Sequence, residues 1–261
     1  MNGQLENPRR AVLITGAVSG IGAATARRFI KEGWLVAINY LDASQREAAL
    51  SLAHTATAPG QGAVAIEGDV VRDADCHGLV EQSVKAFGRL DALVNAAGIS
   101  KIVPQDDLDG LSGEDFRRIY AVNTIGPFQI VRAAAPHLKA SGNGAVVNVS
   151  SRAGITGGGS SIAYAASKGA LNTLTLSLAR VLAPAVRVNA VCPVLVEQGF
   201  VERLAPESFA ERKARLIATS PLRRIGQPDE IAATIYWLVT SASMMTGAIL
   251  ELDFGLHLNA I

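Results

Sequence analysis

The chain has 261 residues, enough for one large α/β domain or two small ones, and we expect one. Its 24 Lys and Arg residues nearly balance its 23 Asp and Glu residues, and the net charge of +1 leaves no electrostatic footprint for nucleic acid or an anionic membrane surface. The two cysteines, Cys76 and Cys192, lie far apart, which excludes a disulfide scaffold and suits a reducing compartment.

Short apolar runs alternate with longer helical patterns along the chain, which is typical of repeated βα units around a parallel sheet. Seven strands are expected, at residues 11–15, 35–39, 63–66, 92–95, 145–149, 186–191 and 249–252. Helices are expected at residues 21–32, about 44–56, about 74–87 and about 113–139, and in the segment that carries Tyr164 and Lys168. The strands are almost continuously apolar, as in a doubly wound sheet with helices on both faces. We therefore predict one α/β domain over residues 1–261.

Residues 194–220 interrupt this rhythm with alternating charged and apolar side chains, as in Ala210-Glu-Arg-Lys-Ala-Arg-Leu. A long connection of this kind suits a substrate-binding lid. A pair of solvated amphipathic helices would show the same pattern, so both interpretations stay open.

No apolar run reaches the ~18 residues that a membrane span requires, and the first ten residues lack the apolar core of a secretory leader. We expect a soluble, cytoplasmic protein with a small-molecule substrate as its partner, without nucleic acid or membrane.

A glycine-rich turn follows the first expected strand and contains Thr15, Gly16, Ser19, Gly20, Ile21 and Gly22. Glycines between a strand and a helix let a dinucleotide pyrophosphate approach the amides of the helix N-terminus. Such spacing is weak evidence in a chain with 25 glycines, but its place between a strand and a helix favours a nucleotide site over a structural turn.

Later strand ends carry residues that suit the same ligand. Asp69, followed by Val70, ends the third expected strand, where a carboxylate could accept a hydrogen bond from an adenine amino group or cap a turn. The small residues from Asn95 and Ala96 to Gly98 end the fourth strand. They permit close approach of the backbone to a ligand, although a tight corner would also explain them.

Tyr164 and Lys168 are four residues apart, so they share one helix face and the ammonium is expected beneath the phenol. Free tyrosine titrates near pH ~10, and a neighbouring cation lowers that pKa toward the range of a general base. Ser151 follows the fifth expected strand, so that both hydroxyl groups are expected to reach one carbonyl oxygen. A phenol acid/base beside a nicotinamide indicates hydride transfer at a carbon that bears oxygen.

Asn123 lies in an otherwise apolar helix segment, where a buried amide must find hydrogen-bond partners. It is a candidate anchor for a water that relays a proton from Lys168, or else a satisfied amide that bends the helix.

Four histidines are spread along the chain: His54, His77, His137 and His257. They show neither ligand spacing nor partner carboxylates at defined intervals, so we expect no metal site. The chain also lacks Gly-x-Ser-x-Gly and Gly-Lys-Ser/Thr, which removes the main support for an α/β-hydrolase or an NTPase.

Together these motifs closely resemble the short-chain dehydrogenase/reductase family, in the branch with 3-oxoacyl-acyl-carrier-protein reductases and many sugar, polyol and steroid dehydrogenases. The resemblance covers nearly the whole chain and extends to Pro221-Leu-Arg-Arg and Thr246-Gly247. It implies a single-domain Rossmann fold, a homotetramer, and an NAD(P)-dependent enzyme that transfers a hydride between the nicotinamide C4 and a secondary alcohol or ketone.

The resemblance also implies a role for each motif residue. Tyr164 is the acid/base, Ser151 orients and polarises the substrate oxygen, and Asn123 holds a relay water. Lys168 lowers the pKa of the phenol and binds the nicotinamide ribose. The implied cofactor contacts are Thr15, Gly16, Ser19, Gly20, Ile21, Gly22, Tyr40, Leu41, Asp69, Val70, Asn95, Ala96, Gly98, Tyr164, Lys168, Pro193 and Val196.

Three positions depart from the family's usual pattern. Val194 and Gln198 replace a glycine and a threonine, which puts the carboxamide pocket in question because valine cannot adopt the positive φ that glycine permits. Phe254 replaces a glycine near the C-terminus and is expected to alter a subunit contact rather than the chemistry.

The preference for NAD or NADP depends on the end of the second strand. An acidic residue there would bind the ribose 2′-hydroxyl, whereas an arginine there or just before Gly20 would favour NADP. Tyr40, Leu41 and Ser19 occupy these places, so neither marker is present. Asp42 shifts our expectation weakly toward NAD, and Arg46 opposes it.

Two narrower or different functions stay open. A 3-oxoacyl thioester reductase acting on an acidic carrier protein would need a basic patch, for which Lys139, Arg152 and Arg180 are candidates. A non-catalytic NAD(P)-binding regulator would keep the fold, but such proteins usually lose the tyrosine or the lysine. The helix after Tyr164 carries more apolar residues than one sheet face can cover, including Leu171, Leu174, Leu176 and Leu178, which supports an oligomer.

Overall fold

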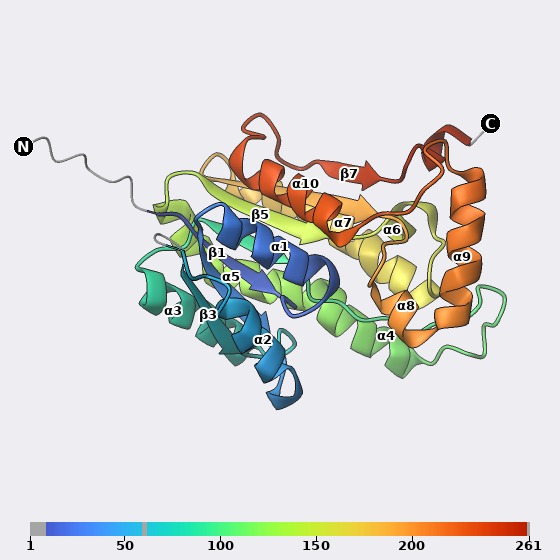
Figure 1. Ribbon diagram of the computed structural model, residues 1–261, viewed down its shortest axis with the longest axis horizontal. Coiled ribbons are helices and arrows are strands. Elements are labelled where there is room, and N and C mark those ends of the chain that lie inside the picture. Colours follow the sequence, from blue (N-terminus) through green and yellow to red (C-terminus); the bar gives the residue numbers. More distant parts are fainter. Residues whose placement is uncertain (1–8, 59–61, 260–261) are drawn as a thin grey trace, which may run out of the picture.

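Seven strands form one parallel sheet in the order β3-β2-β1-β4-β5-β6-β7 in the computed structural model, which describes residues 9–58 and 62–259 (Figure 1). The strands are β1 Ala11–Thr15, β2 Leu35–Tyr40, β3 Gly62–Glu67, β4 Ala92–Asn95, β5 Gly144–Val149, β6 Val186–Pro193 and β7 Ile249–Leu252. This confirms the predicted doubly wound sheet. The ends of the predicted domain, residues 1–8 and 260–261, lie outside the described residues.

Helices cover both faces of the sheet (Figure 1). On one face pack α1 (Gly20–Lys31), α2 (Arg46–Ala53) and α10 (Pro228–Thr240), and on the other α3 (Asp73–Phe87), α5 (Gly126–Ala140) and α7 (Ile162–Leu182). Successive strand residues alternate between these two cores: Val12 and Ile14 of β1 belong to the first and Leu13 to the second. Both faces are therefore dry, which explains the continuously apolar strands.

The predicted helix over residues 113–139 is interrupted. Helix α4 (Gly113–Tyr120) begins at a Ser112 capping box and continues through a π-helical turn, Ala121–Ile125, into α5. A π turn adds a residue to the helical ladder and often occurs at a functional site. Here the turn contains Asn123.

The segment at residues 194–220 forms two helices, α8 (Phe200–Leu204) and α9 (Pro206–Thr219). Figure 1 shows α9 beyond the ends toward which β5 and β7 point. A short helix α6 (Ala153–Thr156) and the helix α10 were not among the predicted elements. Arg187 of β6 donates hydrogen bonds to the carbonyls of Leu238, Val239 and Ala242, so this partly buried cation holds the C-terminal end of α10.

The strand order reverses between β1 and β4, because the chain leaves the β3 edge and returns on the other side of β1. In open α/β sheets, ligands bind in the crevice outside the carboxyl ends of strands at such a reversal. The motifs singled out from the sequence follow these strand ends.

Candidate functional site

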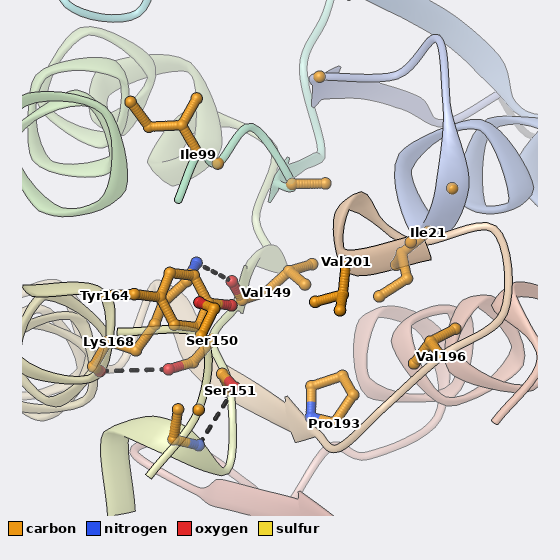
Figure 2. Close-up of a pocket in the computed structure, with 18 of the residues that line it drawn as sticks. Ile21, Ile99, Val149, Ser150, Ser151, Tyr164, Lys168, Pro193, Val196 and Val201 are labelled. Atoms are coloured by element: carbon orange, nitrogen blue, oxygen red, sulfur yellow. Dashed lines mark hydrogen bonds between the residues drawn. The ribbon is translucent and has the colours of Figure 1, made fainter. Parts of the chain in front are cut away.

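A cavity of about 1570 Å³ opens at the carboxyl ends of the strands. It exceeds the ~300–1,000 Å³ of a usual ligand pocket, which leaves room for a dinucleotide together with a substrate. Most residues singled out from the sequence line it: Gly16, Ser19, Gly20, Ile21, Gly22, Leu41, Asp69, Val70, Ala96, Gly98, Ser151, Tyr164, Lys168, Pro193 and Val196. Figure 2 shows Tyr164, Lys168 and Ser151 on one side of this cavity and Ile21, Val196 and Val201 on the other.

The glycine-rich turn lies so close to neighbouring backbone that a side chain would not fit at two of its glycines. Gly16 has φ +60°, and a Cβ there would lie 2.7 Å from the Cα of Ala97; a Cβ on Gly22 would lie 2.2 Å from the carbonyl oxygen of Gly16. Ser19 begins α1 without a side-chain cap, so the first amides of the helix face the cavity without a capping acceptor. This cradle fits a dinucleotide pyrophosphate, whose negative charge the helix N-terminus stabilises.

Three predicted cofactor contacts, Thr15, Tyr40 and Asn95, do not line the cavity. The Thr15 hydroxyl accepts hydrogen bonds from the Ala96 and Ala97 amides at 3.1 and 3.2 Å, so it shapes the loop after β4. The Tyr40 side chain is buried in the core. These three side chains support the wall of the cavity, and their direct contact with a cofactor stays a prediction.

Asn95 begins a buried chain of amides that joins the sheet to α7. Its Nδ2 donates to Asn148 Oδ1 at 2.8 Å, and Asn148 Nδ2 donates to Thr175 Oγ1 at 2.9 Å. These hydrogen bonds fix β4 and β5 relative to α7. Its members are buried in a low-dielectric environment, where removing one partner leaves another unpaired.

The sequence analysis missed Asn39 of β2, which does line the cavity. Its Oδ1 accepts from the Gly16 amide at 3.3 Å, and its Nδ2 donates to the carbonyls of Tyr40 and Gly68. Asn39 thus ties the glycine turn to the ends of β2 and β3. A polar residue inside an apolar strand was the available signal.

Asp69 lines the cavity and also makes a turn, because its Oδ1 accepts from the Val71 amide at 2.9 Å. The two interpretations of this residue are therefore compatible. At the end of β2, Leu41 and Gln45 line the cavity, and the Leu41 amide donates to Gln45 Oε1. Asp42 instead caps the next helical turn by accepting from the Ser44 amide, and it is not among the lining residues.

Helix α7 places Tyr164 and Lys168 at the end of β5. Lys168 Nζ donates to the Val149 carbonyl at 2.8 Å and lies 5.7 Å from the centre of the Tyr164 ring (Figure 2). Ser151 hydrogen-bonds to Tyr164, and its Oγ accepts from the Ala153 amide at 3.1 Å. Ser150 donates to the Lys168 carbonyl at 3.2 Å and so holds the strand end against the helix. The predicted grouping of Ser151, Tyr164 and Lys168 is thus present.

Burial dominates the electrostatics of this group. It raises the pKa of Tyr164 to about 12, and the hydrogen bond with Ser151 acts in the opposite direction. Burial also lowers the pKa of Lys168 to about 8. The pKa of the phenol therefore lies above its ordinary value in the chain by itself, because loss of hydration outweighs the hydrogen bond with Ser151. That Lys168 lowers this pKa stays a prediction.

Asn123 is fully buried and does not line the cavity. Its Oδ1 accepts from the Ile99 amide at 2.9 Å, while its Nδ2 donates to the Ile99 carbonyl and to Ser167 Oγ, both at 3.0 Å. The satisfied-amide interpretation therefore describes its side chain. A Cβ added to Gly98 would lie 3.4 Å from Asn123 Oδ1 and 3.6 Å from Lys168 Nζ, so the two groups flank the same glycine.

The loop after β6 passes over the start of α1: a Cβ on Gly20 would lie 3.4 Å from the Gln198 carbonyl. Val194 is not among the residues with positive φ, and its amide donates to the Leu252 carbonyl, extending the strand pairing. Positive φ falls on Gln198 (55°) and Phe254 (57°) instead. The concern that valine at 194 is strained is therefore wrong.

Arg152, beside Ser151, lines the cavity and lies near two carboxylates of the C-terminal segment. Its Nε is 3.2 Å from Asp253 Oδ2 and 3.5 Å from Glu251 Oε2. His257 Nδ1 lies 3.0 Å from Asp253 Oδ1, four residues away, so this histidine has the carboxylate partner that the sequence analysis did not find.

Lys139 and Arg180 are not among the lining residues. They lie in the last turns of α5 and α7, which lead into the amino ends of β5 and β6, whereas the cavity lies at the carboxyl ends of the strands. Of the three candidates for a basic patch, only Arg152 therefore lines the cavity.

The comparisons with known proteins agree with this geometry. A family model described as enoyl-(acyl carrier protein) reductase, of the short-chain dehydrogenase/reductase type, matches residues 16–257. A solved structure from Burkholderia xenovorans, described as a short-chain dehydrogenase/reductase, is 43% identical, has a TM-score of 0.89, and is matched over 97% of this chain and 100% of that one. The chain belongs to the short-chain dehydrogenase/reductase family.

Curated relatives of this family cover nearly the whole chain. A Streptomyces violaceoruber protein described as ketoacyl reductase 2 of the granaticin polyketide synthase is 42% identical over 94% of this chain and 95% of its own length. Cis-4-hydroxycyclohexanecarboxylate dehydrogenase of Sinomonas cyclohexanicum is 35% identical over 94% and 96%. These similarities confirm an NAD(P)-dependent oxidoreductase that acts on CH–OH groups, and they do not favour a non-catalytic regulator. Within the described part of the chain, no helix is long and apolar enough to cross a membrane.

Proposed function

We propose that the chain transfers a hydride between a nicotinamide cofactor and a secondary alcohol or ketone, with Tyr164 as the proton donor and acceptor. The observation that carries this proposal is the single cavity in which Ser151, Tyr164 and Lys168 meet the glycine-rich turn. A nucleotide bound at the start of α1 would exchange a hydride with the substrate carbon, while the Tyr164 phenol at the end of β5 exchanges a proton with the oxygen on that carbon.

Each residue of the group has a role that follows from its contacts. When bound, the nicotinamide supplies or accepts the hydride. With its raised pKa, the Tyr164 phenol stays protonated at neutral pH and can give its proton to a carbonyl oxygen. The Ser151 hydroxyl donates a hydrogen bond to the same oxygen. Lys168 holds its ammonium at the base of the group and binds the nicotinamide ribose, while Asn123 braces the loop at Ile99.

We infer a preference for NAD at the adenine end of the cavity. The residues from β2 and its loop that line the cavity, Asn39, Leu41 and Gln45, are all uncharged and give a 2′-phosphate no cation. Leu41→Arg should shift the ratio of kcat/KM values toward NADP by roughly tenfold, since a guanidinium pairs well with phosphate. Leu50→Arg on α2, outside this cavity, is the matched control. A wild-type preference for NADP of ~tenfold or more would contradict the inference.

We also propose that residues 194–220 act as the substrate-binding lid of a single domain, and that the protein is a soluble, cytoplasmic homotetramer. The position of α8 and α9 over the cavity supports the lid. Exposed apolar side chains on α5 and α7 support assembly, including Phe128 and Val181.

A panel of ketones and alcohols, followed by NADH and NADPH absorbance, tests the function. We expect turnover of several secondary alcohols or ketones by the wild-type chain and ~10²–10⁴-fold slower turnover by Tyr164→Phe. Turnover that is equal in the two proteins would remove Tyr164 from the mechanism. Absence of any nicotinamide-dependent turnover, together with absence of dinucleotide binding by calorimetry, would refute the function itself.

A further inference from the structure

One face of α9 is turned toward the cavity. The lining residues of this helix are Ser208, Glu211, Arg212, Arg215, Leu216 and Thr219. They recur every three or four positions, which defines a single helical stripe. Phe209 borders this stripe, three residues before Arg212, and its buried ring anchors the helix. A lid over a purely apolar substrate would present an apolar stripe, whereas this stripe contains two arginines.

Arg212 is held in place near the catalytic tyrosine. Its Nε donates to Ser208 Oγ and its Nη1 to the Gly159 carbonyl, both at 3.1 Å. A Cβ on Gly159 would lie 3.7 Å from Tyr164 Cδ1, so the guanidinium sits beside the loop that borders the phenol. A long side chain fixed by two hydrogen bonds is already organised for a ligand.

Neither arginine of the stripe is neutralised by the protein. Within the described part of the chain, no carboxylate lies within ion-pair distance of Arg212 or Arg215. Burial and then the neighbouring Arg215 lower the pKa of Arg212, and Glu211 on the same stripe offsets this only in part. Two adjacent guanidinium groups, one half-buried, favour a negative charge between them.

Several other charges around the cavity already have carboxylate partners. Lys213 binds Glu197, Arg117 of α4 binds Glu114, and Arg152 faces Asp253. Arg203 donates to the Gln198 carbonyl beside the cofactor cradle. The free positive charge at the substrate end therefore lies on the α9 stripe, with Arg118 of α4 as a further lining cation.

We propose that the substrate carries an anionic group, a carboxylate, phosphate or sulfonate, which Arg212 and Arg215 bind while Tyr164 and Ser151 hold the reacting oxygen. This inference rests on the proposed function and specifies its substrate class. Guanidinium groups bind such oxyanions through paired hydrogen bonds, which would also draw the lid down onto the substrate. The separation between the two arginines and the Tyr164 hydroxyl then determines how far the anionic group can lie from the reacting carbon.

The experiment compares ketones that differ only in charge. The probes are 3-oxobutanoate, 4-oxopentanoate and 5-oxohexanoate with their methyl esters, and ketones of matched length that end in phosphate or sulfonate. We expect one anionic length to exceed its ester in kcat/KM. Arg212→Gln and Arg215→Gln should lower that value ~10–100-fold and change the ester less than about threefold. Arg212→Lys should recover part of the loss, and Arg27→Gln on the exposed side of α1 should change neither.

A different result is expected if Arg212 only holds α9 in place through its hydrogen bond to the Gly159 carbonyl and binds no substrate. Loss of the Gly159 contact in Arg212→Gln would then lower kcat/KM for acids and esters equally, and Arg215→Gln, which breaks no side-chain bond, would have no effect. Equal use of acids and esters by the wild type would overturn the proposal and leave the proposed function intact.

Binding measured without turnover separates the two claims further. Calorimetry of the cofactor-loaded chain with glutarate should show binding that Arg215→Gln weakens about tenfold or more, and dimethyl glutarate should not bind. Glutarate binding that is absent from the wild type, or unchanged in Arg215→Gln, would overturn the anion site even if no ketone were reduced.

Discussion

The Tyr164 ring is almost fully buried at the edge of the cavity, and Tyr164→Phe removes only its hydroxyl oxygen and keeps the ring in place. The variant should fold, bind nucleotide and lose ~10²–10⁴-fold in kcat, the usual contribution of a general acid. Steady-state kinetics and dinucleotide calorimetry measure the two properties separately. Tyr236→Phe on α10 is the control, and more than about a tenth of wild-type kcat in Tyr164→Phe would contradict the assignment.

The pKa values of Tyr164 and Lys168 predict how ketone reduction depends on pH. Reduction needs a protonated phenol, which the raised pKa of about 12 ensures, and an ammonium on Lys168, whose pKa is lowered to about 8. We expect kcat/KM for reduction to be level from pH 6 to 7.5 and to fall above pH 8 as Lys168 loses its proton. A rate that rises through this range would show that another group controls the step.

Individual residues differed in how well the sequence revealed them. Ser151, Tyr164 and Lys168 were recoverable because their spacing carries the chemistry. The sequence could not reveal that burial raises the pKa of the phenol, since loss of hydration depends on the residues packed around it. The hydrogen bonds of Thr15 and Asn95 within the protein were hidden for the same reason, because their partners are distant in the sequence.

At the scale of elements, the strand–turn–helix from β1 to α1 depends on two glycines. Gly16→Ala places a Cβ 2.7 Å from the Ala97 backbone at φ +60°, so the turn must shift. We expect at least a tenfold rise in the dinucleotide Kd and a lower Tm. Gly33→Ala is the matched control, because it has φ +80° but nothing within 4 Å of its Cβ. It should cost only the ~1–2 kcal/mol of left-handed backbone and leave Kd within about twofold.

An unchanged Kd in Gly16→Ala, with the same Tm loss as in Gly33→Ala, would show that the turn does not hold the nucleotide. Calorimetry and thermal unfolding together distinguish these outcomes.

The predicted bounds of the helices and strands agree with the structure where the hydrophobic pattern alone determines the element. The strands β1, β4 and β7 have the predicted bounds, and the others begin or end within two residues of them. The π turn at Ala121–Ile125 was hidden, because its residues remain compatible with an α-helix and only the side-chain bonds of Asn123 mark the change. The role of Arg187 was also hidden, since its three acceptors lie more than fifty residues away.

For the whole molecule, the uncovered apolar side chains of α5 and α7 predict assembly. Phe128 and Val181 are 41% and 69% exposed. Light scattering at micromolar concentration should give about four times the 27.2 kDa mass of one chain. Phe128→Glu with Val181→Glu should reduce that mass, because charges resist burial at an interface. Leu108→Glu, at an exposed loop position, is the control.

A monomeric wild-type chain at these concentrations would refute the tetramer. A tetramer that the double variant leaves intact would place the contacts on other surfaces, such as the C-terminal segment around Phe254.

The position of β1 inside the sheet, between β2 and β4, has a consequence for folding during synthesis. Val12 of β1 pairs with Val36 of β2 on one side and with Ala92 of β4 on the other. During synthesis β2 emerges first and can pair with β1. The other side of β1, which is almost fully buried in the folded protein, has no partner until β4 emerges about fifty residues later. That open apolar edge is a template for mispairing with another nascent chain. Closely spaced ribosomes should therefore disfavour recovery of folded protein, and less frequent initiation, which keeps nascent chains apart, should favour it.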